Sequence, residues 1–408
     1  MISDVKRNLM EHSVVSCLLT CSWVVVFHCP PVQAATPDTV HLRGQFQNAC
    51  LRFESEKTGH VAFIGGSITE MNGYRPMVME ILQGRFPQTE FTFTAAGISS
   101  TCSTTGAFRL HDHVLSKGPV DLFFIEFAVN DDQDAHHLRR ECIRGMEGIV
   151  RHTRLHNPYS DIVITYFVNP EMLATWQSGK VPLSVGAHRE VAEYYGIPTI
   201  NLAKETADRV TAGTLTWKQF GGTHPKPLGN KICASMIDRM MSKYWTAPLP
   251  DHIRSKAHPL PVDPLDRKSY WRGRLIAPDQ VEVIRDMMVK IPDWSTIKGN
   301  CRSRFVNDRL LCATKPGAEM VLDFEGTTIG AYVLAGPDAG MVEASVDDGP
   351  FRPFNLYHHY SSGLHYPRTV VFDADLKSGA HTLHLRISAD RDERSMGHAV
   401  RVLHFVAN

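Results

Sequence analysis

The chain has 408 residues, of which 43% are hydrophobic, and it carries 43 basic and 43 acidic side chains. This composition is that of a globular protein with room for about two or three domains, and it excludes a mainly disordered, collagen-like or coiled-coil chain. Because the formal net charge is zero, the sequence offers no bulk basic field for a nucleic-acid backbone, and nucleic acid is not an expected partner.

Residues 1–34 have the features of a secretory signal peptide. Lys6 and Arg7 precede a short apolar run over residues 14–27, and Val32-Gln33-Ala34 provides a small-residue cleavage site. The apolar run is shorter than the roughly 20 residues of a membrane-spanning helix. We therefore predict cleavage near Ala34, a secreted or periplasmic location and no stable membrane span afterwards. The alternative is an uncleaved N-terminal anchor.

Export would place the chain in an oxidising compartment, where disulfides form. Outside the predicted signal peptide the cysteines are Cys50, Cys102, Cys142, Cys233, Cys301 and Cys312. Six cysteines allow fifteen pairings, among which the sequence alone does not choose; Cys301 and Cys312 are the most plausible pair, because they are near in sequence and flank a loop-like stretch. Cys142 and Cys233 lie in helical patterns and are expected to be buried free thiols. No CxxC or CxxH spacing occurs, so no zinc site is predicted.

Between residues 59 and 245, short apolar strands alternate with helical patterns. The predicted strands are 60–64, 91–95, 120–129, 161–168 and 198–202, and the predicted helices are 75–86, 107–115, 133–156, 185–195 and 227–244. Strands separated by helices favour a parallel sheet that is covered on both faces. We therefore predict one α/β domain over residues 35–245.

The composition changes after this domain. Residues 246–268 are rich in proline and are predicted to form a linker or a draped segment. Short predicted strands then follow at 320–324, 329–334, 341–346, 369–372, 381–387 and 400–405, with Asp348-Gly349 and Ser378-Gly379 as turn signals. This spacing is typical of an antiparallel β-sandwich, which we predict as an accessory domain over residues 269–408.

Three polar stretches of the α/β part contain candidate functional residues. Gly65-Gly66-Ser67 follows the first predicted strand, at the edge of a parallel sheet where ligands bind. Asn130-Asp131-Asp132 follows the strand 120–129, and His224 precedes Pro225 on a loop ahead of the last helix. Taken singly, each has an ordinary explanation as a helix cap, a turn residue or a hydrogen-bonded loop histidine.

Together these residues can carry nucleophilic catalysis. A serine hydroxyl becomes an effective nucleophile when a neighbouring base accepts its proton, and His224 suits that task near neutral pH. The tetrahedral intermediate also needs donors directed at its oxyanion. The backbone amides of Ser67 and Gly97 and the side chain of Asn130 are the candidates for this oxyanion hole.

Ser67, Gly97, Asn130 and His224 resemble, in order and spacing, the four blocks of the SGNH (GDSL-type) hydrolases. The resemblance covers about residues 59–245. It implies a flavodoxin-like three-layer α/β/α fold and ester hydrolysis through an acyl-serine intermediate. It also implies that Ser67 and His224 are catalytic and that neither a metal nor an organic cofactor takes part. The GxSxG motif of α/β-hydrolases is absent, because Ile68-Thr69 follows Ser67.

The sequence departs from this family at the third member of the triad. The family usually has an aspartate three residues before the histidine, whereas this chain has Gly221 there. We expect a Ser–His dyad in which a backbone carbonyl of the loop 217–221 orients His224. Asp131, Asp132 and Glu126 are the alternative supporting carboxylates.

Glu126 interrupts the apolar run 120–129 and shares strand parity with Asn130, so both side chains are expected on one face. It is either a carboxylate that supports the site or a buried glutamate that pairs with Arg75, Arg109 or a histidine. We favour the second interpretation.

The sequence thus predicts a secreted serine esterase that acts on a small ester or an O-acetylated glycan. The C-terminal part resembles the jelly-roll accessory domains of some carbohydrate esterases. His358-His359, with Tyr357, Tyr360 and Tyr366 nearby, forms either a sugar-stacking patch or a polar loop. Two alternatives are a catalytically impaired glycan-binding protein and an O-acyltransferase on the same scaffold. The sequence makes no prediction of the oligomeric state.

Overall fold

The computed structural model describes residues 39–245 and 254–408. Residues 39–408 form one compact unit. The predicted signal peptide and the start of the predicted linker, residues 246–253, lie outside the described residues. Within the part that the structure describes, no helix is both long and apolar enough to cross a membrane.

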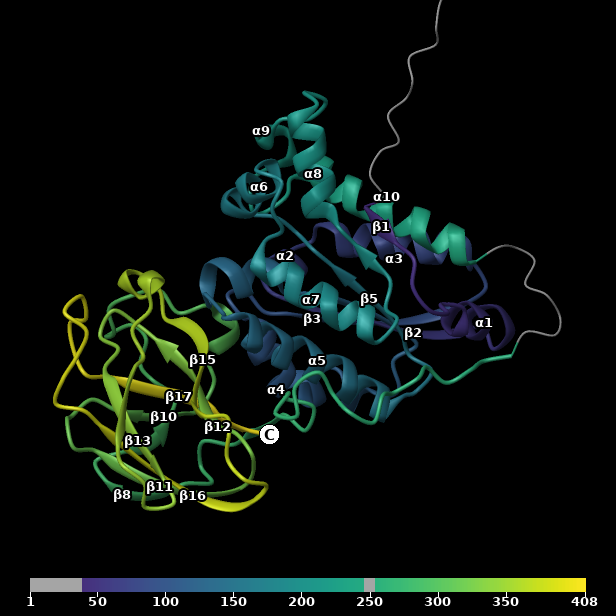
Figure 1. The fold of residues 1–408 in the computed structure, drawn as a ribbon. Coiled ribbons are helices and arrows are strands. Elements are labelled where there is room, and N and C mark those ends of the chain that lie inside the picture. Colours follow the sequence, from purple (N-terminus) through teal and green to yellow (C-terminus); the bar gives the residue numbers. More distant parts are fainter. Residues whose placement is uncertain (1–38, 246–253) are drawn as a thin grey trace, which may run out of the picture. The chain divides into compact units, whose positions relative to one another are not determined.

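A six-stranded sheet between helices forms the first half of this unit (Figure 1). In spatial order its strands are β1 (Val40–His41), β6 (Thr199–Ile200), β5 (Asp161–Thr165), β4 (Leu122–Glu126), β2 (Thr58–Gly65) and β3 (Glu90–Gly97). All neighbours pair in parallel except β1 and β6. The central strand β4 is buried at every residue, which explains its continuous apolar sequence.

The helices of this half are α1 (Asn48–Ser55), α2 (Ser67–Glu70), α3 (Tyr74–Arg85), α4 (Ser103–His113), α5 (Arg139–His156), α6 (Pro170–Gln177), α7 (Leu183–Tyr194), α8 (Leu202–Thr211), α9 (Trp217–Phe220) and α10 (Pro227–Tyr244), with a short turn η1 (Leu115–Lys117). The predicted α/β fold is confirmed. The strand predicted over 120–129 is wrong beyond Glu126, because a π-helical turn η2 (Asn130–Asp134) separates β4 from α5.

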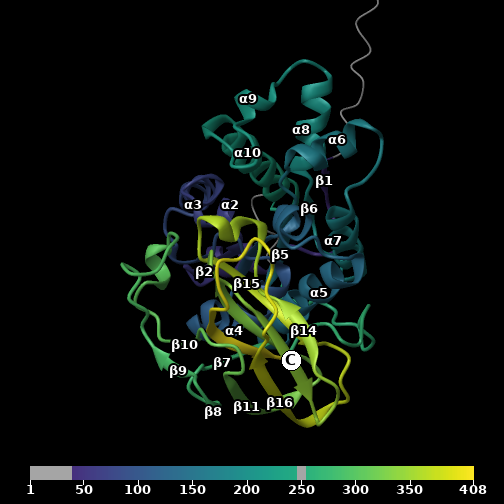
Figure 2. The same ribbon diagram turned by 90° about the vertical axis from the view of Figure 1, so that its left-hand side faces the viewer.

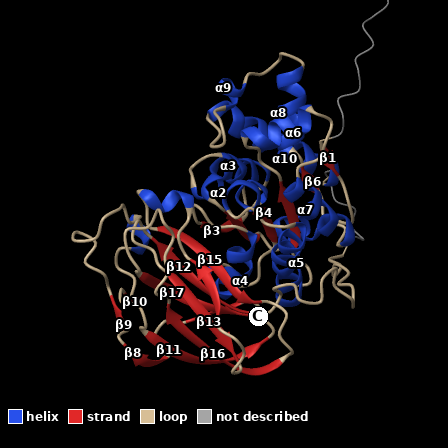
Figure 3. Ribbon diagram, turned by 60° about the vertical axis from the view of Figure 1, so that its left-hand side comes forward, coloured by secondary structure: helices blue, strands red, loops and turns tan. Residues whose placement is uncertain are grey.

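Two antiparallel sheets form the second half. Their strands lie in the lower part of Figure 3, and Figure 2 gives a second view. One contains β15 (Tyr366–Asp373), β12 (Ile329–Ala335), β17 (Val400–Ala407), β10 (Leu310–Ala313) and β9 (Met288–Lys290), with β7 (Arg274–Ile276) beside β17. The other contains β14 (Arg352–Asn355), β13 (Met341–Val346), β16 (Gly379–Ile387), β11 (Glu319–Gly326) and β8 (Glu282–Arg285). Two short turns, η3 (Ser303–Phe305) and η4 (His359–Ser362), belong to loops of this half. The predicted β-sandwich is confirmed.

The described part of the proline-rich segment lies along α5. The buried Arg151 donates to the carbonyl of Pro261 at 2.8 Å, and the buried Arg154 donates to the carbonyl of Pro259 at 2.9 Å. Because arginines of α5 bind its backbone in this way, residues 254–268 correspond to a draped segment and not to a free linker.

All six cysteines in the described residues are free thiols. The predicted bond between Cys301 and Cys312 is therefore wrong. Cys312 lies inside β10, between β9 and β17, whereas Cys301 lies in a loop with its Sγ 3.7 Å from the carbonyl of Arg302. Nearness in sequence suggested the bond, but the two residues belong to different local structures. Cys142 and Cys233 are buried in α5 and α10, as predicted.

Candidate active site

Ser67 is the first residue of α2 and follows β2 directly. The chain turns tightly here: a Cβ on Gly65 would lie 2.3 Å from Oγ1 of Thr69, and one on Gly66 would lie 2.0 Å from Oδ1 of Asn130. Only glycine tolerates such close approaches. The apolar strand and the two glycines together place the half-buried Ser67 hydroxyl at the carboxyl edge of the parallel sheet.

His224 reaches Ser67 from the loop between α9 and α10. Its Nε2 lies 2.8 Å from Oγ of Ser67, although 157 residues separate the two positions in sequence. The ring is exposed, and Pro225 behind it is buried. When the ring proton is on Nδ1, the serine hydroxyl donates to Nε2, which is the arrangement needed for a base that accepts the hydroxyl proton.

Gly221 has a backbone conformation that excludes the aspartate found there in the family. It ends α9 with a φ of 113°, and a Cβ on it would lie 2.1 Å from the backbone nitrogen of Lys226. The loop that carries His224 therefore requires glycine at position 221. Within the described residues, Ser67 Oγ is the hydrogen-bond partner of the His224 ring, and no carbonyl of residues 217–221 accepts from it.

The three alternative carboxylates are held by other partners. Asp131 accepts from the backbone N–H of Ser103 at 2.8 Å and from its hydroxyl at 2.7 Å. Asp132 accepts from Nδ2 of Asn169 at 2.9 Å. Glu126 lies at the end of β4, inside the sheet. In the described part of the chain, none of the three forms a hydrogen bond with the histidine of the site.

Asp134 is the carboxylate that binds the Asn130 side chain, and sequence reasoning missed it. It is buried in η2, where Asn130 Nδ2 donates to its Oδ2 at 2.5 Å and Gln133 Nε2 donates to its Oδ1 at 3.2 Å. Burial raises its pKa, while these hydrogen bonds and the charges of His359 and His224 oppose the rise. The spacing of four residues after Asn130 was the available signal.

Gly97 and Asn130 lie on either side of the Ser67 turn. Gly97 pairs with Gly65 across β2 and β3, and a Cβ on it would lie 2.3 Å from the backbone nitrogen of Glu70 in α2. The Nδ2 group of Asn130 carries two hydrogens and uses one for its bond to the carboxylate of η2, so one donor remains. The structure therefore brings the four predicted residues to the same edge of the sheet.

Residues 63–232 match the GDSL-like lipase/acylhydrolase family. These residues form a GDSL-like lipase/acylhydrolase domain. The resemblance inferred from the four sequence blocks is confirmed, and the protein is a carboxylic ester hydrolase.

Solved structures show the same pairing of halves. A two-domain esterase (CEX) active on acetylated mannans has a TM-score of 0.70 and 20% sequence identity, over 90% of this chain and 96% of that chain. A second structure of a two-domain esterase (CEX), co-crystallized with mannopentaose, has a TM-score of 0.68 and 21% identity, with the same coverage. At this identity the likeness concerns the fold, and it extends over both halves. No curated protein matches the chain.

Two arginines of the sandwich bind the acylhydrolase domain beside Ser67. Arg304, in η3, donates to the carbonyl of Gly97 at 3.1 Å and pairs with Glu70 of α2. Arg302 donates to Oγ of Ser100 at 2.8 Å. Ser100 has a φ of 72°, a conformation that costs energy for a residue with a side chain, so contacts from the second half help to hold it.

We expect Arg304→Gln to lower kcat for p-nitrophenyl acetate about tenfold with little change in KM, because it releases two segments that position Ser67. Arg309→Gln is the matched control, since Arg309 forms an exposed pair with Asp279. Steady-state kinetics of the two variants and the unmodified protein make the comparison. Equal kcat values for all three would show that the segment after β3 keeps its position without Arg304.

Glu126 is completely buried and has no cationic partner among the described residues. Thr69 Oγ1 donates to its Oε2 at 3.2 Å. The predicted ion pair is wrong, because Arg75 donates to the carbonyl of Thr69 and Arg109 donates to the carbonyl of Ala96. Burial raises the pKa of Glu126 to about 8, and the hydrogen bonds from Thr69 and from a backbone N–H lower it only in part. The carboxyl is therefore mostly protonated at neutral pH.

This raised pKa makes stability depend on pH. An unfolded glutamate ionises near pH 4.5, whereas Glu126 in the folded chain ionises near pH 8, so unfolding between these values releases a proton. The free energy of unfolding therefore falls as pH rises from about 4.5 to about 8. Glutamine cannot ionise, so we expect the Tm of Glu126→Gln, relative to the unmodified protein, to increase from about pH 5 to about pH 8. Glu80→Gln, at an exposed position, should show no such trend.

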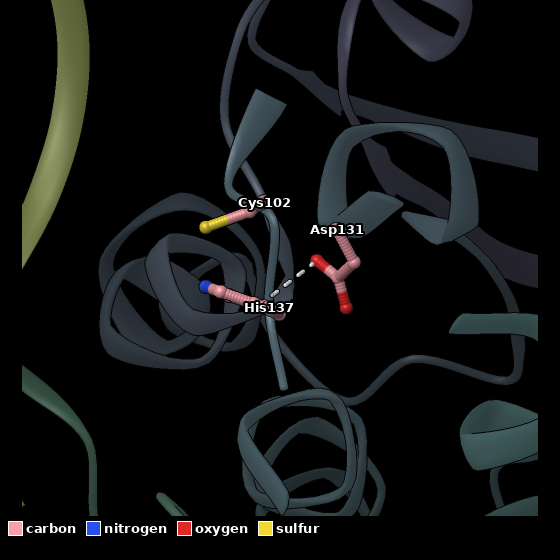
Figure 4. A group of neighbouring side chains, drawn as sticks. All are labelled: Cys102, Asp131 and His137. Carbon is pink, nitrogen blue, oxygen red and sulfur yellow. Dashed lines mark ion pairs between the residues drawn. The ribbon is translucent and has the colours of Figure 1, made fainter. Parts of the chain in front are cut away.

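A second polar cluster is buried near Asn130. Its donor atoms form two overlapping groups, each within 4.8 Å: Cys102, Asp131 and His137 (Figure 4), and Asp131, Cys142 and His188. Both oxygens of the shared carboxylate already accept hydrogen bonds from the protein, including one from His188 Nε2 at 2.9 Å. We therefore assign no metal to this cluster. Only Asp131 was among the predicted site residues.

Proposed function

We propose that this protein is a secreted serine esterase that removes acetyl groups from O-acetylated glycans. Ser67 is the nucleophile and His224 the general base of a dyad. The observation that supports this proposal most directly is the 2.8 Å contact between Ser67 Oγ and His224 Nε2 at the carboxyl edge of the sheet.

The reaction follows from this contact. Ser67 Oγ attacks the carbonyl carbon of the acetyl ester while His224 Nε2 accepts the hydroxyl proton. The amides of Ser67 and Gly97 and the remaining N–H of Asn130 receive the negative charge on the carbonyl oxygen. Collapse of the intermediate expels the sugar oxygen, which takes the proton from His224 and leaves acetyl-Ser67. Water then attacks this ester with His224 again as base.

Exposed aromatic rings beside Asp134 support a glycan as the substrate. His358 Nε2 donates to the carbonyl of Asp134 at 2.8 Å and so holds the η4 loop against η2. Two rings of this loop are exposed, His359 and Tyr360, with centroids 4.0 Å apart, and His136 lies 6.1 Å from His359. Sugar rings pack their C–H faces on such surfaces.

Only part of the aromatic group considered from the sequence is available to a sugar. Tyr357 and Tyr366 are buried, and the exposed rings are those that flank the η2 turn. The two-domain esterase with the same fold is active on acetylated mannans. We propose the same class of substrate, an acetylated polysaccharide, for this protein.

An acetate-release panel tests the proposal. Purified protein is incubated with acetylated mannan, acetylated xylan and p-nitrophenyl acetate, and a Ser67→Ala variant is treated in parallel. Acetate should appear from at least one polysaccharide with the unmodified protein and not with the variant. Transfer of the acetyl group to an added sugar, with no free acetate, would favour an acyltransferase. Glycan binding without turnover would favour a binding protein.

A further inference from the structure

Cys102 lies at a cavity that neither Ser67 nor His224 lines. The residue precedes α4 directly, at the position of the N-terminal cap. The cavity has a volume of about 440 Å³, and its lining includes Cys102, His137, Tyr366 and Arg368, whereas Ser67 and His224 do not line it. Small molecules that enter this cavity can therefore meet the thiol without passing through the ester-cleaving site.

The thiol and an imidazole line this cavity, and a buried carboxylate lies beside the imidazole. Figure 4 shows one nitrogen of His137 on the same side as the Cys102 sulfur, while the dashed line joins the ring to Asp131. Asp131 Oδ1 lies 3.6 Å from Nδ1 of His137, and donor atoms of all three residues lie within 4.8 Å. The bonds from Ser103 and His188 fix the carboxylate. An imidazole placed in this way can take the proton of a thiol.

The surrounding charges favour a thiolate. Several titratable and charged groups interact electrostatically with Cys102. They are His137, Asp131, Arg109, Arg368, Cys142, Tyr332 and Tyr366. Burial alone would raise the pKa of the Cys102 thiol, but the nearby His137 lowers it below its ordinary value. Burial lowers the pKa of His137, but Cys102 and Asp131 raise it well above its usual range. The N-terminus of α4 adds a partial positive charge.

We propose that Cys102 is a nucleophilic thiolate and that its cavity is a site of covalent modification by small, soft electrophiles. With a hydroperoxide, the sulfur attacks one peroxide oxygen and the O–O bond breaks. His137 gives its proton to the departing oxygen, so the thiol is oxidised to a sulfenic acid and the peroxide is reduced to an alcohol or water. With iodoacetamide, an S–C bond forms and iodide leaves. The site is independent of the Ser67 chemistry.

Cys301 is an internal control within the same chain. It is more exposed than Cys102, but burial and, to a smaller extent, the nearby Asp308 raise its pKa to about 11. If exposure governed reactivity, Cys301 would react first. If the imidazole governs it, Cys102 would react first.

The test is iodoacetamide labelling of the full chain near pH 6.5, with peptide mass spectrometry to follow each cysteine over time. We expect Cys102 to be labelled at least about tenfold faster than Cys301. His137→Gln should slow Cys102 labelling at least about tenfold near pH 6.5, because the buried thiol then loses the group that lowers its pKa. His111→Gln, an exposed position on α4, is the matched control.

Three results would overturn the proposal: faster labelling of Cys301 than of Cys102, an unchanged Cys102 rate in His137→Gln, or bound zinc that shields Cys102 until a chelator removes it. Thermal unfolding of each variant shows whether it is folded. If His137→Gln does not fold, the labelling rate of the unmodified protein as a function of pH decides. A midpoint for Cys102 at or above 8.5 would then overturn the proposal.

Discussion

Ser67→Ala and His224→Ala are each expected to lower kcat/KM for p-nitrophenyl acetate by about 1,000-fold or more. In the proposed mechanism the hydroxyl proton passes between two atoms that lie 2.8 Å apart, so loss of either side chain removes the same step. The double variant should therefore be no slower than the slower single variant. Steady-state kinetics of the three variants and the unmodified enzyme measure this.

Ser116→Ala is the control for this comparison, because Ser116 is an exposed serine that binds the carbonyl of Asp112 on the surface. It should keep full activity. Losses that multiply in the double variant would mean that Ser67 and His224 contribute separately, which is incompatible with a dyad.

Gly97→Ala is expected to lower kcat by about 100-fold or more. The new Cβ would lie 2.3 Å from the backbone nitrogen of Glu70 and 2.5 Å from the carbonyl carbon of Thr69, so α2 must move. That movement displaces Ser67 and misdirects the Gly97 amide, and loss of one oxyanion donor alone costs about 100- to 1,000-fold. The measurement is kcat for p-nitrophenyl acetate together with Tm.

Gly84→Ala provides the matched control for this substitution. Gly84 lies in α3 and has no atom within 4 Å of the added methyl group, so the variant should keep its activity and have an equal or slightly higher Tm, because alanine favours a helix more than glycine does. Full activity in Gly97→Ala would show that α2 tolerates the methyl group and that the amide of residue 97 is not a required donor.

The sequence was most informative where local pattern and burial agree. Buried strands such as β4 have continuous apolar sequences, and α10 begins at Pro227, whose fixed φ suits the first turn of a helix. The strands β8 and β14 were missed because their residues are mostly exposed and so show no alternation of apolar and polar side chains. Their pairing comes from neighbouring strands and not from their own composition.

In the candidate site, too, residues with a local sequence signal were identified and residues placed by distant contacts were missed. Ser67 and His224 were identified because each stands at a local landmark, a strand end and a residue before proline. Asp134 was missed because its position depends on the π-helical turn that places it against Asn130. Arg304 was missed because it reaches Gly97 from 207 residues away, and no local pattern encodes such a contact.

Arg302 and Arg304 donate hydrogen bonds to the segment after β3. These bonds limit which sandwich domains can be combined with an acylhydrolase domain of this kind. We expect that a sandwich grafted from another protein must supply two cations at the same place, because otherwise the segment that carries the proposed oxyanion donor Gly97 loses these contacts. A chimera without them should fold and still turn over slowly. The two halves therefore do not behave as interchangeable modules, and engineering one of them requires compatible side chains on the other.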